Sequence, residues 1–279
     1  MNYKILDNVI RIEGKKDFNI RHILDCGQIF AYQNNIVYSN QDVAVISETE
    51  KGFDIYCSDC YYFENFFDLK TDYSKIKDKL KKEKLLKKPI EFGNGIRILK
   101  NDIFEVMISF IISANNNIKR IQLILSKLRE ALGKKCENFF KNLDMKIEYY
   151  AFPTYEKLLS VDEQFFIDIG CGYRAKYLYN FLRQISMEEI SNWKNLSTEE
   201  LKSKLISLSG IGPKVADCIL LFGYAKMDVF PVDTWINQMY NQYFEPSNNR
   251  LLIRKNLVSR YKDLSGYAQQ YLFYYQRSK

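Results

Sequence analysis

Lys214 is the residue of this chain best placed to act as a covalent nucleophile. It follows the turn Gly210-Ile-Gly212 and lies one position inside the helix that Pro213 is expected to begin. Proline suits a first helical position because its missing N–H would be unpaired there anyway. The positive end of a helix dipole disfavours an ammonium at this point and favours the neutral amine, which can attack an electrophilic carbon.

Two helices must position this lysine. Ser197-Thr-Glu-Glu200 is a capping-box signature, and it predicts the start of the first helix. Gly210 and Gly212 allow a tight turn before the second helix, so we expect a helix-hairpin-helix over about residues 198–224. The free N–H groups at the start of the second helix form an anion site that fits a DNA phosphate.

The composition is that of a folded globular protein with an excess of basic residues. The 279 residues are 47% hydrophobic and 15% aromatic, and the net charge is +7. This charge suits a polyanionic partner, although a charge of this size is not specific by itself. No apolar run is long enough to span a membrane, and the start lacks the apolar region of a signal peptide. We therefore expect an intracellular, cytoplasmic protein without membrane contact.

Six cysteines are scattered through the chain, at positions 26, 57, 60, 136, 171 and 218. Disulfides are rare in intracellular proteins, so we expect none. Cys57-Ser-Asp-Cys60 has the spacing of a zinc-ligand pair, but no second pair follows and His22 is the sole histidine. A structural zinc site takes four such ligands. We expect neither a metal bound by side chains nor another cofactor.

Residues 1–92 predict a small antiparallel sheet domain. Short β-prone runs follow one another without helical periodicity between them, at residues 9–12, 29–32, 36–38, 43–46 and 53–56. Asn34-Asn35 is a turn signal between two of these runs. Helical periodicity begins near Tyr73. The basic stretch from Lys77 to Lys88 is interpreted as a solvated helix face rather than a phosphate-binding patch.

Residues 93–279 predict a domain that is almost entirely helical. The segment from Pro89 to Gly95 reads as a connector before it. Asp102 is an N-cap candidate for a buried apolar helix over residues 103–112, and a second helix is expected over residues 118–132. The sheet part and the helical part together predict an α+β fold.

Seven segments, the hairpin among them, occur in an order that is specific to one family. They are Gly27–Phe30, Phe92–Leu99, Ser113–Arg120, Gly172–Lys176, the hairpin around Lys214, Pro231–Asp233 and Tyr267–Phe273. Through these segments, which are distributed over most of the chain, the sequence resembles the 8-oxoguanine DNA glycosylase/lyase family of the helix-hairpin-helix DNA glycosylase superfamily. The resemblance implies a TBP-like N-terminal sheet domain and a monomer that repairs double-stranded DNA.

The resemblance implies that Lys214 is the catalytic lysine and Asp233 the catalytic aspartate. The neutral amine attacks C1′ of the damaged nucleotide as the base departs, and the resulting Schiff base lets β-elimination cut the strand. The Asp233 carboxylate stabilises positive charge on the sugar, and the residue is also a good helix N-cap. Asp217, three residues after Lys214, is a rival carboxylate that we rank as structural.

Four residues match family positions that recognise the base. The base must leave the stack to be reached, and 8-oxoguanine has an N7–H donor where guanine has an acceptor. By resemblance the carbonyl of Gly27 accepts this N–H, and Gln269 reads the Watson–Crick edge. Phe273 and Cys218 match residues that contact the two faces of the base.

Other matching residues surround the lesion. Asn115 matches the residue that fills the vacated space, and Tyr173 matches a tyrosine wedged into the stack. Arg120 and Arg174 match arginines that contact the opposite cytosine, so we predict a preference for cytosine there. Trp235 departs from the histidine that better-known animal members use to contact a phosphate, and this phosphate contact must therefore differ.

The resemblance also bears on ions. The family binds a monovalent cation through hairpin carbonyls, here around Ile206, Leu208 and Ile211. Several helix-hairpin-helix glycosylases carry a four-cysteine iron–sulfur cluster near the C-terminus. No cysteine follows Cys218, so we expect no such cluster.

Two alternatives stay open. The chain could be a helix-hairpin-helix glycosylase for another damaged base, or a non-catalytic DNA-binding protein that uses the hairpin only to hold phosphate. The missing iron–sulfur cysteines and the strand-rich start weigh against the first alternative. The joint presence of Lys214 and Asp233 weighs against the second.

Overall fold

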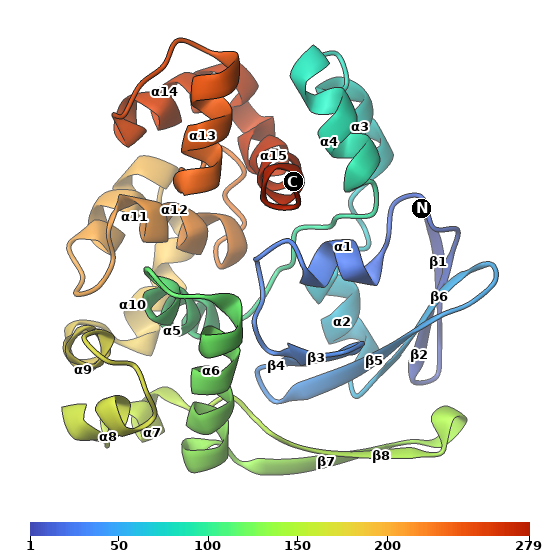
Figure 1. The fold of residues 1–279 in the computed structure, drawn as a ribbon. Helices are drawn as coiled ribbons and strands as arrows, with labels where there is room; N and C mark the ends of the chain where they lie inside the picture. The colour runs from blue at the N-terminus through green and yellow to red at the C-terminus, as the bar shows by residue number, and fades with distance from the viewer.

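The computed structural model describes all residues from Met1 to Lys279 and has the predicted α+β architecture (Figure 1). An antiparallel six-stranded sheet comes first, in the order β1-β2-β6-β5-β4-β3. Its strands are β1 (Asn2–Leu6), β2 (Val9–Glu13), β3 (Tyr32–Gln33), β4 (Ile36–Ser39), β5 (Asp42–Glu48) and β6 (Gly52–Cys57). Helices α1 (Ile20–Leu24) and α2 (Cys60–Phe66) pack on one face of this sheet.

Alternating apolar side chains set the register of the sheet. In β5, Ala44 and Ile46 join the cluster beneath α1 and α2, whereas Val43 and Val45 point to the other face. Asn34, in the left-handed region at φ +54°, forms the predicted turn between β3 and β4. The predicted strands over residues 9–12, 36–38, 43–46 and 53–56 are confirmed.

Three features of the N-terminal part differ from the sequence prediction. The strand expected over residues 29–32 is reduced to Tyr32–Gln33, because Ile29 and Phe30 pack into two different apolar clusters. The edge strand β1 was not predicted, since every one of its residues is at least partly exposed. Helices α1 and α2 were missed because helices this short show little periodicity.

A second hairpin corrects the expectation that the chain beyond residue 92 is almost entirely helical. Strands β7 (Lys135–Phe140) and β8 (Met145–Tyr150) pair with each other and lie across the sheet face opposite α1 and α2 (Figure 1). Phe140, Ile147 and Tyr149 pack there against Val43 and Val45. Charged residues dominate the outer face of this hairpin, whereas its apolar face is buried only because the sheet lies against it.

The remaining elements are helical, and none of these helices combines the length and the apolar character that a membrane span requires. They are α3 (Tyr73–Leu80), α4 (Lys87–Phe92), α5 (Ile103–Ser113), α6 (Ile118–Leu132), α7 (Tyr155–Leu159), α8 (Glu163–Asp168), α9 (Arg174–Gln184), α10 (Met187–Asn192), α11 (Thr198–Ile206), α12 (Pro213–Phe222), α13 (Thr234–Tyr243), α14 (Arg250–Tyr261) and α15 (Ser265–Arg277).

The cap and bounds predicted for the first long helices are confirmed. The Asp102 side chain accepts the N–H of Glu105 at 2.9 Å at the start of α5, and α6 covers the expected residues 118–132. The connector expected from Pro89 to Gly95 is wrong in its first half. Pro89 lies in the first turn of α4, where a proline is compatible with a helix.

Helices α3 and α4 pack against the C-terminal end of the chain. Leu80, Leu86 and Ile90 belong to an apolar cluster whose other members come mostly from α13, α14 and α15, and Figure 1 shows α3 and α4 beside α15. Lys77 departs from the predicted solvated face, because it is buried and paired with the buried Asp17. The remaining lysines of this basic stretch are at least partly exposed.

Arg97 is the most deeply buried cationic side chain of the fold, with no exposed surface. Its guanidinium donates to the carbonyls of Phe67 (2.8 Å), Asp17 (3.1 Å), Asp68 and Thr71 (3.0 Å). The guanidinium also lies 4.1 Å from the centroid of a buried tyrosine ring. Four carbonyls from two separate segments therefore depend on one side chain.

We predict that Arg97→Met lowers the free energy of unfolding by about 3 kcal/mol, because buried carbonyls lose their donors. Urea denaturation monitored by circular dichroism measures this change. Lys15→Met is the control, since Lys15 pairs with Glu48 and both side chains are exposed, and its removal should cost less than about 1 kcal/mol. Equal losses for the two variants would contradict the role given to Arg97.

Candidate active site

The predicted helix-hairpin-helix is formed by α11 and α12. The capping box is complete, because the Ser197 side chain accepts the N–H of Glu200 and the Glu200 side chain accepts the N–H of Ser197. Pro213 is the first residue of α12. Gly210 has φ +80°, and a Cβ there would lie 2.7 Å from the Cβ of Tyr177. Gly212 has extended backbone and open space around it, and no side chain caps α12. The start of α12 therefore keeps free N–H groups for an anion.

Lys214, Cys218 and Asp233 are brought together at this helix start. Lys214 lies in the first turn of α12, with its Nζ 5.6 Å from the ring centroid of Phe110. Cys218 is one turn later and 4% exposed; burial raises the pKa of its thiol to about 11, and the contact with Lys214 opposes that rise.

Asp233 performs the capping role predicted for it. Its carboxylate accepts the N–H of Ile236 at 2.9 Å at the start of α13. Burial raises the pKa of this carboxyl, while the N–H of Ile236 and the charge of Lys214 oppose the rise. The structure thus places the carboxylate close enough to the Lys214 amine to interact with its charge.

Three of the four residues predicted to recognise a base come from opposite ends of the chain. Gly27, at φ +78°, lies against α15, and a Cβ there would be 3.0 Å from Cε1 of Phe273. Gln269, also on α15, is 4% exposed, and its Oε1 has no hydrogen-bond partner. Buried polar atoms are rarely left unpaired, so this oxygen is a natural acceptor for a ligand. Cys218 belongs to a different helix, α12.

The turn between α5 and α6 gathers most of the residues predicted to contact DNA. Asn115 is exposed at φ +49°, and its carbonyl accepts Arg174 Nη2 at 2.7 Å. Arg174 is 4% exposed, donates also to the carbonyl of Ala114, and lies 4.4 Å from the Tyr173 ring. These contacts, with one to the carbonyl of Cys171, use three of the five N–H donors of the guanidinium. Arg120 is exposed and donates to Gly170.

Two other predicted features have weaker structural signatures. Trp235 is 40% exposed in the first turn of α13, beside Asp233, and its ring is thus accessible from solvent. Among the carbonyls proposed for a monovalent cation near Ile206, Leu208 and Ile211, that of Leu208 accepts the Ile211 N–H at 3.3 Å. A carbonyl oxygen has two lone pairs, so this bond leaves capacity for a cation.

The cysteine pair of the sheet domain lies apart from these residues. Cys57 ends β6 and Cys60 begins α2, and their buried Sγ atoms are 3.0 Å apart. The structure contains no group of three or more histidine, cysteine, aspartate or glutamate side chains arranged to bind a metal.

Comparison with known proteins identifies the fold family. A family model of the 8-oxoguanine DNA glycosylase N-terminal domain matches residues 10–107, and one of HhH-GPD superfamily base excision DNA repair proteins matches residues 108–262. A probable N-glycosylase/DNA lyase of Methanothermobacter thermautotrophicus is 30% identical over 242 residues, which are 78% of this chain and 73% of that protein. The chain belongs to the 8-oxoguanine DNA glycosylase/lyase family. It is therefore a base excision DNA repair protein.

Two other relatives of this glycosylase/lyase are informative. The N-glycosylase/DNA lyase of Saccharomyces cerevisiae is 33% identical over 183 residues, 61% of this chain, but the match spans only 47% of the yeast protein. The Clostridium acetobutylicum 8-oxoguanine glycosylase/lyase, solved with double-stranded DNA containing cytosine opposite 8-oxoguanine, is 37% identical. The two structures superpose with a TM-score of 0.90, covering 100% of this chain and 98% of that one.

Sequence reasoning about this glycosylase/lyase missed residues that support the predicted ones. Arg277 lies 5.2 Å from the Phe273 ring and donates to the carbonyl of Asp25, next to the Gly27 turn. Its position one helical turn after Phe273 is a signal that could have revealed it. Gln270 donates to the carbonyl of Cys26 at 2.9 Å. Both contacts hold the Gly27 turn against α15.

The two hairpin glycines give a matched test of the site geometry. We predict that Gly210→Ala lowers the free energy of unfolding by at least about 2 kcal/mol, because the new Cβ is strained at positive φ and meets Tyr177. Gly212→Ala should cost no more than about 1 kcal/mol, since its backbone is extended and the Cβ enters open space. Urea titration of the wild type and the two variants measures these free energies. Similar losses in both variants would contradict this hairpin geometry.

Proposed function

We propose that this protein removes 8-oxoguanine, and with it formamidopyrimidine lesions, from positions opposite cytosine in double-stranded DNA, and then cuts the strand. Two observations carry the proposal: Lys214, Cys218 and Asp233 meet at the start of α12, and the Gly27 turn contacts Phe273 on α15, the helix that also carries the buried, unpaired Gln269 oxygen. The family relationship supports it, as does the DNA complex of the Clostridium acetobutylicum relative.

In the proposed reaction the Lys214 amine is the nucleophile. Its Nζ forms a bond to C1′ while the glycosidic bond breaks, and the base leaves with the bonding electron pair and takes up a proton. Asp233 stabilises positive charge on the sugar in a buried setting where such an interaction is strong. Loss of the amine proton and ring opening give a Schiff base, which acidifies the C2′ hydrogens and permits β-elimination of the 3′ phosphate.

Recognition in this proposal uses the single donor that distinguishes the lesion from guanine. The Gly27 carbonyl accepts the N7–H of 8-oxoguanine, whereas guanine would present a lone pair to it. The unpaired Gln269 Oε1 accepts an N–H from the Watson–Crick edge. Phe273 and Cys218 then contact the two faces of the flipped base. Asn115, Arg120 and Arg174 face the cytosine that remains in the duplex.

We predict that borohydride traps a covalent adduct between the wild-type protein and a duplex with 8-oxoguanine opposite cytosine, because hydride reduces the Schiff base. Lys214→Gln should lose the adduct but keep duplex affinity within about a factor of five. Denaturing gel electrophoresis measures trapping and fluorescence anisotropy measures binding.

The controls are Lys204→Gln, which changes an exposed lysine of α11, and duplexes with undamaged guanine or with adenine opposite the lesion. Trapping should persist in Lys204→Gln, fail with guanine and weaken with adenine. An adduct that survives in Lys214→Gln would refute the assignment of the nucleophile.

We predict that activity falls as the pH drops through the raised pKa of Asp233. Only the ionised carboxylate stabilises the sugar cation, and burial raises this pKa, so the loss begins at a higher pH than for an exposed aspartate. Asp233→Asn keeps an N-cap but should lower the single-turnover rate about 100-fold or more, and should remove this acid limb. A variant that keeps the wild-type acid limb would show that another group titrates.

A further inference from the structure

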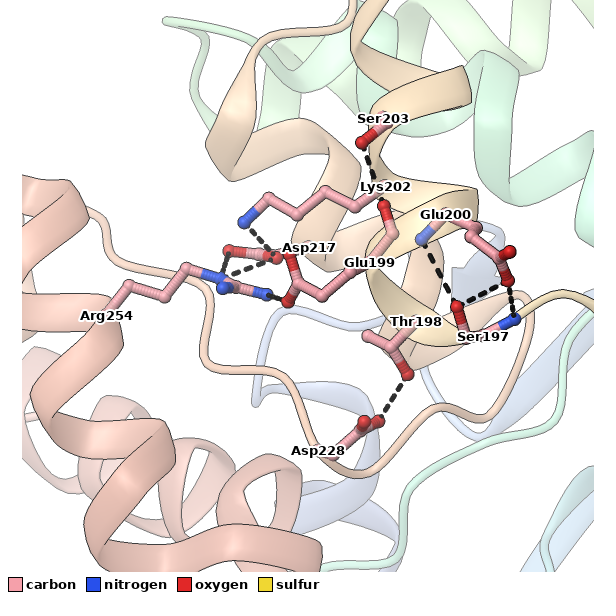
Figure 2. Close-up of polar contacts among 9 residues, drawn as sticks. All are labelled: Ser197, Thr198, Glu199, Glu200, Lys202, Ser203, Asp217, Asp228 and Arg254. Carbon is pink, nitrogen blue, oxygen red and sulfur yellow. Dashed lines mark hydrogen bonds and ion pairs between the residues drawn. The ribbon is translucent and has the colours of Figure 1, made fainter.

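Asp217 is a buried carboxylate that the proposed chemistry does not use. It lies on α12 three residues after Lys214, and its side chain is 2% exposed. It accepts Lys202 Nζ at 2.8 Å and Arg254 Nε at 2.9 and 3.0 Å (Figure 2). The structure thus agrees with its ranking as structural, but it also shows that two cations from two neighbouring helices converge on this one carboxylate.

These contacts tie together the elements that carry the reacting groups. Lys202 belongs to α11 and Arg254 to α14, so Asp217 joins α12 to both helices. Arg254 reaches on to Glu199 at 3.2 Å, in the first turn of α11.

A neighbouring hydrogen bond extends this network toward the second reacting group. Thr198 Oγ1, at the start of α11, donates to Asp228 at 2.7 Å, in the segment that runs on to Asp233 (Figure 2). The helix of Lys214 and the segment of Asp233 are therefore both anchored to residues 198–202 of α11.

Stability alone does not account for ions at this position. Burial raises the pKa of Asp217 and lowers that of Lys202, and their mutual attraction opposes both shifts. Apolar residues of similar volume often stabilise a protein as well as a buried ion cluster does. Helix α12 already buries a long apolar face, including Val215, Ile219 and Leu220. The hydrogen-bonded ions add directional contacts, because each hydrogen bond fixes the position of one donor group relative to one acceptor group.

Lys214, Asp217 and Arg254 also line one cavity of about 390 Å³, between the starts of α12 and α14. The ion cluster therefore lies in the wall of the space beside the nucleophile. A small rotation or shift of the first turn of α12 would move the Lys214 amine relative to Asp233, and a displacement of about 1 Å can reduce a rate about 100-fold.

We propose that Asp217, held by Lys202 and Arg254, is a positioning residue that fixes the Lys214 amine relative to Asp233 for attack on the sugar. This inference rests on the function proposed above. Asp217 acts through Lys214, so its removal should affect the chemical step more than DNA binding.

The test compares Asp217→Asn with wild type in three measurements: melting temperature, duplex affinity and the single-turnover rate of trapping. Two duplexes are used, one with 8-oxoguanine opposite cytosine and one with an abasic site, whose aldehyde reacts with an amine without base excision. Asp217→Asn should slow both reactions about 10- to 100-fold and change affinity less than about threefold.

Two further variants separate positioning from folding. The triple variant Lys202→Met, Asp217→Leu and Arg254→Met replaces the ions by apolar groups, and it should regain melting temperature without regaining rate. Asp17→Asn removes the carboxylate of the buried pair with Lys77, and it should lower melting temperature while leaving the rate unchanged below the transition. A triple variant that regains both properties would show a merely structural role.

The abasic duplex separates failure of this inference from failure of the proposed substrate. If the wild type traps the abasic duplex but not the 8-oxoguanine duplex, the assigned lesion is contradicted. Slower trapping of the abasic duplex by Asp217→Asn would still support the positioning role. Lysine-dependent wild-type trapping with an unchanged rate in Asp217→Asn would overturn the role of Asp217 alone. If Lys214→Gln is trapped as well as the wild type, both proposals are overturned.

Discussion

The buried guanidinium of Arg97 is the constraint on which the arrangement of this molecule depends. Its donors satisfy the carbonyl of Asp17, which follows β2, and three carbonyls of the segment between α2 and α3. The segment that carries it also receives Gln28, whose amide donates to the Arg97 carbonyl at 2.8 Å and accepts the N–H of Leu99 at 2.8 Å. The turn at Gly27 is thus held through Gln28 by residues 97–99, which belong to the stretch that joins the two parts of the chain.

A site assembled in this way draws its members from distant parts of the chain. Gly27 comes from the N-terminal part, Lys214 from the middle of the helical part, and Gln269 and Phe273 from the last helix. None of these groups forms a pocket locally, because each element exposes only one or two of them. Packing of α15 against both the Gly27 turn and the helices around α13 brings Gly27 into contact with Phe273.

Features encoded locally could be predicted from the sequence, whereas those that depend on tertiary packing could not. The caps at Asp102 and Ser197 and the start of α12 at Pro213 involve residues only a few positions apart, so local chemistry determines them. The hairpin β7–β8 was missed because its apolar residues become buried only once the sheet is present to receive them. Likewise nothing in the sequence around Asp217 identifies Lys202 and Arg254 as its partners. Their meeting depends on how three helices pack.

The β7–β8 hairpin changes what the sheet can be used for. A TBP-type sheet can serve as a saddle, whose open face lies in the minor groove of DNA. Here α1 and α2 occupy one face, and the hairpin occupies the other over Val43 and Val45. This sheet has no open concave face at its centre to lay against a double helix. In this molecule both faces of the sheet are therefore used at its centre for packing within the chain.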